Sequence, residues 1–304
     1  MLQINNLKKR YKKHAVLTDL NMTLEKGDVY GFLGTNGCGK TTTMNIICNI
    51  IPKDEGEIVF DNENIKIGYL PESPTLYNYM NGYEYLNYIG ACGNYSGNIS
   101  ARTAEVLEIT GMTTSAKRMI GGYSRGMNQR IGIAAALYAN PELLILDEPT
   151  SALDPEGRAE VMSIIGSLAD SGTTIILCTH ILTDVERVAN KIGILKDGRM
   201  AVEGRVSDVK KQFLQNCALG VRLRSYSSDV TNALSSLDIV SKSEIADPGG
   251  VTLYAKDGIT EKELYSVVIK TLEENDVLPE SLYFKRMSLE QIYLGITSGT
   301  LQSD

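Results

Sequence analysis

The sequence predicts an open α/β sheet in which apolar strands alternate with helices. DVYGFLG at residues 28–34, ELLILDEP at 142–149 and TTIILCTH at 173–180 are continuous apolar runs, as in strands buried inside a parallel sheet. Helical patterns lie between them, at residues 40–50 and near 155–170. Polar residues follow each strand, so the functional side chains should gather at the carboxyl edge of the sheet.

Composition and charge narrow the class of protein. The chain has 304 residues, 43% hydrophobic and 22% charged, which is ordinary for about two packed domains. The net charge of −7 argues against a nucleic-acid partner, which requires a basic face. There is no apolar run long enough for a membrane span and no signal-peptide core. The 5 cysteines form no CxxC pair, so neither disulfides nor zinc are indicated and a cytoplasmic protein is expected.

A mostly helical stretch is predicted over residues 81–140. It opens at Asn81, with Glu84 three residues later, which is the spacing of a capping box. A cluster of tyrosines surrounds this start, at positions 77, 79, 83, 85 and 88. Packing inside the helical region and a surface that anchors a partner are both open interpretations of the cluster.

Around residue 210 the pattern changes to that of a smaller unit. Strand-like GVRLRS and GVTLYA are followed by a helix with a capping box at Thr260 and Glu263. A last helix opens in the same way at Ser288 and Gln291. We therefore expect a small α/β accessory domain at the end of the chain.

The stretch GTNGCGKTT at residues 34–42 predicts a phosphate-binding loop. It fits the pattern G-x-x-x-x-G-K-[ST] and lies between a buried strand and a helix, which is the context that the pattern requires. Lys40 should reach the β and γ oxygens of a nucleotide, and the Thr41 hydroxyl can ligate Mg²⁺. The candidate nucleotide-binding residues are Gly34, Asn36, Gly37, Cys38, Gly39, Lys40, Thr41 and Thr42.

Polar side chains at two strand ends complete the predicted catalytic edge. Asp147 ends an apolar strand and is placed to hold the metal opposite Thr41. Glu148 beside it is the candidate general base for an attacking water. His180 ends the next strand and is the candidate contact to the γ-phosphate.

The basic stretch KKRYKKH at residues 8–14 precedes the loop and contains one aromatic ring. Tyr11 has the flat face that stacking on adenine requires, although a tyrosine packed in the core is an equally good interpretation of the residue alone. His14 lies in no functional pattern and is expected at the surface.

A second candidate anion site lies in GGYSRGMNQR at residues 121–130. Ser124 can cap the helix that follows. The free N–H groups of the first turn, with the positive end of the helix dipole behind them, favour a phosphate oxygen. One chain therefore carries two candidate phosphate sites.

These motifs, in this order, resemble the ATP-binding subunit of ABC transporters over residues 1 to about 212. The matching segments are a Walker A loop (GTNGCGKTT), a Q-loop position (Glu72 in YLPES), a signature (YSRGM, 123–127), a Walker B strand (LLILDE), a D-loop (SALD, 151–154) and a switch histidine (His180). The resemblance implies a P-loop NTPase (RecA-like) core in residues 1–212, with a helical subdomain at about 73–142. The accessory domain would then occupy 213–304.

The resemblance also implies why two phosphate sites occur. In the family, two cassettes pack head to tail, and the signature of one contacts the γ-phosphate held by the Walker A loop of the other. ATP and Mg²⁺ would be the cofactors, a homodimer is expected, and Tyr11 would stack on adenine. The signature residues acting on the partner's nucleotide would be Ser124, Arg125, Gly126 and Met127. Ser151 and Asp154 would be the D-loop residues.

Three departures from the family pattern stand out. The signature reads YSRG instead of the usual Leu-Ser-Gly-Gly, but Ser124 and Gly126 are kept. Glu72 replaces the Q-loop glutamine, so it is a further candidate metal ligand in an altered role. Thr35 and Cys38 stand where Pro and Ala are common, and their side chains should point away from the phosphates.

A single cassette with an extension ending in MSLEQIYLGIT is similar to the exporter branch, whose ATPase is separate from its membrane permease. The resemblance implies ATP hydrolysis on the inner face of the cell membrane that drives export of drug, peptide, lipid or polysaccharide. The tyrosine cluster follows the Q-loop, where the family receives a helix of the permease. The alternatives are a soluble ABC ATPase acting on ribosomes or DNA, which the acidic charge disfavours, and a regulatory cassette, which the complete catalytic set disfavours.

Overall fold

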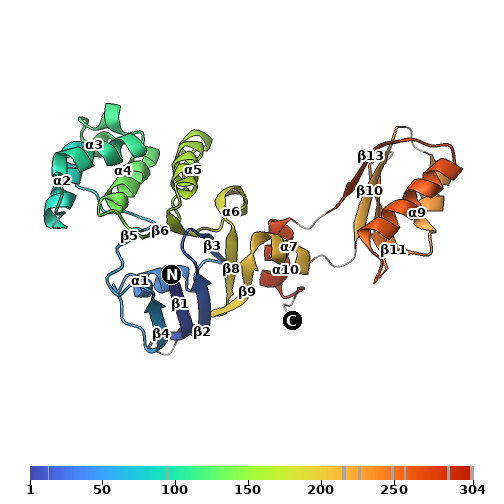
Figure 1. Ribbon diagram of the computed structural model, residues 1–304, viewed down its shortest axis with the longest axis horizontal. Helices are drawn as coiled ribbons and strands as arrows, with labels where there is room; N and C mark the ends of the chain where they lie inside the picture. The colour runs from blue at the N-terminus through green and yellow to red at the C-terminus, as the bar shows by residue number, and fades with distance from the viewer. Residues whose placement is uncertain are drawn as a thin grey trace. The chain divides into compact units, whose positions relative to one another are not determined.

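The computed structural model describes residues 1–12, 14–93, 95–213, 217–224, 227–247, 250–256, 258–285 and 288–301. The chain forms two compact units, Met1–Val209 with Tyr293–Asp304, and Lys210–Ile292 (Figure 1). The division after Val209 lies close to the expected boundary at residue 212. The end of the chain differs from the expectation, because residues from Tyr293 onward belong with the first unit.

A nine-stranded sheet runs through the described part of the first unit, in the order β4-β1-β2-β9-β8-β3-β7-β6-β5. Strands β8, β3, β7, β6 and β5 pair in parallel, and β1, β2 and β4 pair antiparallel. The strands are β1 (Leu2–Tyr11), β2 (His14–Leu24), β3 (Val29–Gly34), β4 (Glu55–Phe60), β5 (Ile67–Leu70), β6 (Leu143–Asp147), β7 (Thr174–Cys178), β8 (Lys191–Lys196) and β9 (Arg199–Arg205). Every residue of β3, β6 and β7 is buried, which is why these strands read as unbroken apolar runs.

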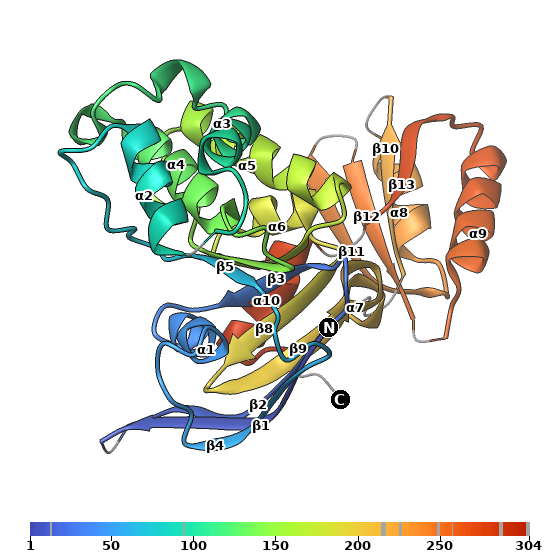
Figure 2. The same cartoon turned by 60° about the vertical axis from the view of Figure 1, so that its left-hand side comes forward.

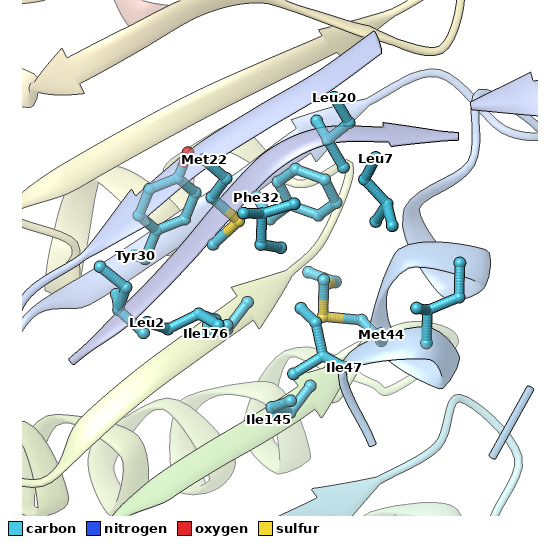
Figure 3. Close-up of a cluster of buried hydrophobic side chains, with 14 of the residues drawn as sticks. Leu2, Leu7, Leu20, Met22, Tyr30, Phe32, Met44, Ile47, Ile145 and Ile176 are labelled. Carbon is cyan, nitrogen blue, oxygen red and sulfur yellow. The ribbon is translucent and has the colours of Figure 1, made fainter. Parts of the chain in front are cut away.

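The main hydrophobic core lies between helix α1 (Lys40–Ile47) and the strands around it. Figure 3 shows Met44 and Ile47 of α1 facing Phe32 of β3 and Ile145 of β6. Each side chain of this size contributes roughly 1.5–3 kcal/mol when it is fully buried. The core therefore fixes the start of α1, at the predicted phosphate loop, against the ends of the parallel strands.

Three helices form the middle of the first unit, α2 (Gly82–Cys92), α3 (Ile99–Ile109) and α4 (Arg125–Leu137). They pack side by side (Figure 2). The predicted capping box at Asn81 and Glu84 is confirmed, since both of its hydrogen bonds form. Short 3-10 turns at Thr113–Ser115 and Ile120–Gly122 lead into α4. Helices α5 (Pro155–Asp170) and α6 (Leu182–Val188) belong to the first unit, and α7 (Val206–Gln212) continues from it into the second unit.

The second unit alternates strands and helices in the order β-α-β-β-α-β, which is the ferredoxin-like arrangement. Its antiparallel sheet has the order β11-β12-β10-β13, and Leu253 of β12 and Leu264 of α9 belong to its separate apolar core. The elements are β10 (Ala218–Leu223), α8 (Ser228–Ser235), β11 (Val240–Asp247), β12 (Gly250–Ala255), α9 (Glu261–Glu274) and β13 (Pro279–Phe284). The predicted accessory unit is thus α/β, and its capping box at Thr260 and Glu263 is confirmed.

Helix α10 (Leu289–Ser298) follows the ferredoxin-like unit and continues into the residues that belong with the first unit. Both predicted hydrogen bonds between Ser288 and Gln291 form at its start. Near its end, Lys196 Nζ donates to the Ile296 carbonyl at 2.7 Å. A cation at the last turn of a helix also interacts favourably with the helix dipole. The contact of Lys196 with this turn gives a physical reason why the end of the chain belongs with the first unit.

The capping box of α9 gives a test of the two separate cores. Thr260→Ala removes the side-chain acceptor of the Glu263 amide, which costs about 1 kcal/mol. We expect amides of α9 to exchange with deuterium about fivefold faster, and those of α1 at an unchanged rate. Thr260→Ser keeps the acceptor and should exchange like the wild type. Faster exchange in α1 as well would contradict separate stabilisation of the two units.

Candidate functional site

A cavity of about 540 Å³ opens at the carboxyl ends of the parallel strands. The strand register produces it, because Cys178 of β7 lies opposite both Phe32 of β3 and Asp147 of β6. The residues that follow these strands therefore meet at one edge. The cavity is lined by His14, Val16, Asn36, Gly37, Gly39, Lys40, Thr41, Thr42, Glu72, Asp147, Glu148, Ser151 and His180.

The predicted phosphate loop forms one wall of this cavity. Gly37 and Gly39 have φ of 80° and 116°, in the left-handed region that glycine adopts without strain. Lys40 is 6% exposed, and its Nζ donates to the Gly34 carbonyl at 2.7 Å, so the side chain lies along the loop. Helix α1 begins at Lys40, and the unpaired N–H groups of its first turn make this wall suited to an anion.

Two of the predicted loop residues, Gly34 and Cys38, do not line the cavity. A Cβ on Gly34 would lie 2.5 Å from the Cys38 sulfur and 2.8 Å from the Leu195 carbonyl. The Cys38 side chain therefore packs against the ends of β3 and β8. Burial raises the pKa of the Cys38 thiol.

Asp147 is the most buried carboxylate of the site, at 1% exposed. Neither of its carboxylate oxygens has a hydrogen-bond partner among the described residues. Burial raises the pKa of the Asp147 carboxyl, and the nearby Thr41 hydroxyl opposes that shift without reaching hydrogen-bond geometry. A buried, unpaired carboxylate near a hydroxyl is the hard-oxygen environment that Mg²⁺ prefers, so the residues present fit this ion.

Glu148 is held in a strained position by its neighbours. Its φ is 50°, which is uncommon for a residue other than glycine, and its N–H donates to the Cys178 carbonyl at 2.8 Å. The side chain is also fixed, because Oε2 lies 2.9 Å from His180 Nδ1 and accepts from the Thr179 hydroxyl at 3.4 Å. Such strain is typical of functional sites, where surrounding contacts hold one side chain in place.

Most of the predicted signature and D-loop lines a second pocket, of about 340 Å³, whereas Ser151 of the D-loop lines the first cavity and Met127 of the signature lines neither pocket. Ser124 caps α4 as predicted, because its hydroxyl accepts from the Met127 N–H at 3.2 Å. Asp154 caps α5 by accepting from the Gly157 N–H at 3.0 Å. The pocket is lined by Ser124, Arg125, Gly126, Ala152, Leu153, Asp154, Glu156, Gly157 and Glu160. Among the described residues, the linings of the two pockets share no member.

The segment before the loop contributes residues that the sequence analysis missed. His14 is exposed, as expected, yet it borders the cavity together with Val16 of β2. Tyr11 is 47% exposed, lies opposite His14 in the β1–β2 pair and does not line the cavity. Lys9 Nζ lies 5.7 Å from the centroid of its ring. Stacking of Tyr11 on adenine stays a prediction.

The Q-loop position also has a partner that the sequence did not indicate. Glu72 is exposed and lines the cavity, and its carbonyl accepts from Gln129 Nε2 at 3.5 Å. Gln129 lies on α4, the helix that Ser124 caps. The backbone of the Q-loop position is thus connected to the helix of the signature.

Comparisons with known proteins show the family of the chain. The ABC transporter family model matches residues 17–151. The linearmycin resistance ATP-binding protein LnrL of Bacillus subtilis (strain 168) is 32% identical, over 99% of this chain and 100% of its own length. The chain belongs to the ABC transporter family. The lantibiotic transport ATP-binding protein SrtF of Streptococcus pyogenes is 38% identical, over 67% of this chain and 90% of its own.

Solved structures define the enzyme class. A dimeric, post-hydrolysis structure of the ATP-binding cassette MJ0796 with ADP and Pi has a TM-score of 0.61 and 26% identity, covering 68% of this chain and 99% of that one. The chain is therefore an ABC ATPase with the P-loop NTPase fold that the resemblance implied. No helix in the described part of the chain is long and apolar enough to cross a membrane.

The position of Glu148 predicts the effect of a nearly isosteric change. Glu148→Gln keeps the size of the side chain but removes its capacity to take a proton, so turnover should fall at least about 100-fold while ATP still binds. The measurement is phosphate release at saturating ATP and Mg²⁺, together with calorimetric titration of ATP. Glu63→Gln changes an exposed glutamate outside the cavity lining and serves as the control. Near-normal turnover of Glu148→Gln would assign the base to another residue.

Proposed function

We propose that the chain hydrolyses ATP with Mg²⁺ at a site shared by two copies and thereby drives a separate membrane permease. The observation that carries the proposal is the presence of two half-sites in one chain. The phosphate loop lines one pocket with Glu148 and Ser151, and the signature lines another with the rest of the D-loop. The dimeric cassette of MJ0796 supports the pairing of two copies.

The residues of the first pocket that act on phosphate, metal and water have separate parts in this proposal. Lys40 and the start of α1 bind the phosphates, and Thr41 and Asp147, with Glu72 as a further candidate, would hold Mg²⁺. When bound, Mg²⁺ neutralises charge on the β- and γ-phosphate oxygens. Glu148 takes a proton from water as the water oxygen bonds to the γ-phosphorus, and the bond to the bridging oxygen breaks to leave ADP.

His180 orients the base and completes the γ-phosphate site. Its Nδ1 contacts Glu148 at 2.9 Å, so the other ring nitrogen is available to the phosphate. The second pocket acts on the partner's nucleotide. There, the amides at the start of α4, the Ser124 hydroxyl and Arg125 face the γ-phosphate held by the other copy.

The tyrosine cluster supports the permease as a partner. Tyr77 lies 5.7, 6.1 and 5.5 Å, between ring centroids, from Tyr79, Tyr85 and Tyr88. Tyr85 is buried, whereas Tyr79 and Tyr88 are 69% and 41% exposed. The cluster is thus anchored in the helical region and partly open to a partner, as tyrosine-rich contact surfaces are. This surface supports our further proposal that the chain binds the cytoplasmic face of the membrane through the permease.

The relatives support export as the direction and an antibiotic-like compound as the cargo. LnrL is named for linearmycin resistance and matches nearly the whole chain, including the accessory unit. SrtF and the BcrA protein of Enterococcus faecalis are named for lantibiotic transport and for bacitracin transport. We propose that this chain drives export of a drug or peptide of this antibiotic kind.

The cargo class is testable in cells that produce the protein with its permease. Lys40→Ala removes the cation of the phosphate loop and should abolish transport, because the loop then binds nucleotide poorly. We expect the minimum inhibitory concentration of at least one compound in a panel of linearmycin, lantibiotics and bacitracin to fall several-fold. Lys53→Ala, at an exposed position outside the cavity lining, is the control. Equal resistance of both variants to the whole panel would contradict this cargo class.

The shared site is testable by mixing two inactive variants. Lys40→Ala damages the phosphate loop, and Ser124→Arg places a bulky cation in the signature pocket, so each variant alone should form inactive dimers. In a mixed dimer, one site receives both lesions and the other joins an intact loop to an intact signature. We expect ATPase activity to reappear on mixing, measured by phosphate release.

The control is each variant mixed with itself at the same total concentration. Absence of recovery, when mass spectrometry shows that mixed dimers form, would mean that each chain closes its own site or that both sites must act together. Either result would contradict the proposal that one site built from two chains is sufficient to hydrolyse ATP.

A further inference from the structure

Asp184 is a buried carboxylate outside the cavity lining, at 4% exposed. It lies on α6, one helical turn after His180. Its Oδ2 accepts from the Thr150 hydroxyl at 2.6 Å, and its Oδ1 accepts from Arg158 Nε at 2.9 Å. A charged group this deeply buried is costly unless its hydrogen bonds are made, and here both oxygens are paired.

The partners of Asp184 belong to the segment that carries the base and the D-loop. Thr150 is 2% exposed and lies two residues after Glu148 and directly before Ser151. Arg158 lies in the first turn of α5, after the D-loop, and its Nη2 also donates to the Thr183 hydroxyl at 2.6 Å. Asp184 therefore joins the two ends of the D-loop segment to the helix that follows His180.

We propose that Asp184, through Thr150, is a positioning residue that holds Glu148 in register with His180. The same two segments are already joined once, by the contact between Glu148 and His180 at 2.9 Å. That first contact involves a half-exposed histidine, whereas the bond between Thr150 and Asp184 is fully buried. The buried bond can hold the two segments in place when water and nucleotide compete for the exposed one.

Strain at Glu148 explains why a second connection is needed. Glu148 and Ala152, on either side of Thr150, have φ of 50° and 57°, and neither is glycine. A backbone in this region relaxes unless its surroundings hold it. The Thr150 hydroxyl bond is a side-chain restraint between the two strained positions, so its loss should displace the base more than it weakens nucleotide binding.

The test uses the full chain and measures kcat and KM for ATP separately. Thr150→Val keeps the volume but removes the hydroxyl, and should lower kcat about tenfold with KM unchanged within about twofold. Thr150→Ser keeps the hydroxyl and should restore kcat. Asp184→Asn should also lower kcat. The double variant with Thr150→Val should be no slower than the slower single variant, because both substitutions act on the same bond between Thr150 and Asp184.

Thr174→Val is the matched control for stability. Thr174 is also buried, at 1% exposed, and its hydroxyl accepts from the Gly27 N–H at 3.0 Å, at the opposite end of β7 from His180. This variant should lose thermal stability but keep kcat. Equal kcat values for Thr150→Val and Thr174→Val would overturn the proposal, as would a change in KM alone or independent, multiplying effects of Thr150→Val and Asp184→Asn.

The proposal rests on the role of Glu148 proposed above, and the same assay separates the two. If Glu148→Gln is inactive but Thr150→Val turns over normally, only the positioning role fails. If Glu148→Gln retains turnover, the assignment of the base fails. Should Thr150→Val not fold, Asp184→Asn against Thr174→Val gives the same comparison.

Discussion

The parallel pairing of β3, β7 and β6 is the constraint on which the rest of the site depends. Phe32 lies opposite Cys178, and Cys178 lies opposite Asp147, so β6 and β7 end at one level and β3 continues from there into the phosphate loop. A shift of one residue would turn each side chain to the other face of the sheet and remove Asp147 from the cavity. The phosphate loop, the two acids and His180 meet only because this register is kept.

Apolar packing stabilises this strand register, whereas two residues of the site destabilise the fold. Phe32, Ile145 and Ile176, from the same three strands, belong to the core that also buries Met44 of α1 (Figure 3). At the strand ends, Asp147 is buried with no hydrogen-bond partner among the described residues, and Glu148 has a left-handed backbone; both features destabilise the fold. The core offsets these costs, which fits the general trade between stability and function at active sites.

Features that depend on neighbouring residues were predictable from the sequence. The capping residues Asn81, Ser124 and Thr260 bond to groups three residues away, and the structure has all three caps. The buried strands were predictable for a similar reason, because burial on both faces leaves an unbroken apolar run. The phosphate loop combines both signals, a local glycine pattern and a strand before it.

Features that depend on distant contacts were not predictable. His14 borders the cavity because β2 passes beside the phosphate loop, and Lys196 reaches Ile296 across 100 residues of sequence. Asp184 and Thr150 are separated by 34 positions, so no local pattern marks their bond. The roles that we propose for the site residues rest on the family and the geometry together, since Ser124 and Lys40 line separate pockets in one chain.

The central claim is that nucleotide is bound between two copies of the chain. Sedimentation of the Glu148→Gln chain with ATP and with ADP tests this claim most directly. The account predicts a dimer with ATP, because each γ-phosphate joins one phosphate loop to the partner's signature, and a monomer with ADP, which lacks that phosphate. Adding Ser124→Arg to the same chain should leave it monomeric with ATP. A chain that binds ATP and yet stays monomeric, or that dimerises equally with ADP, would contradict the account.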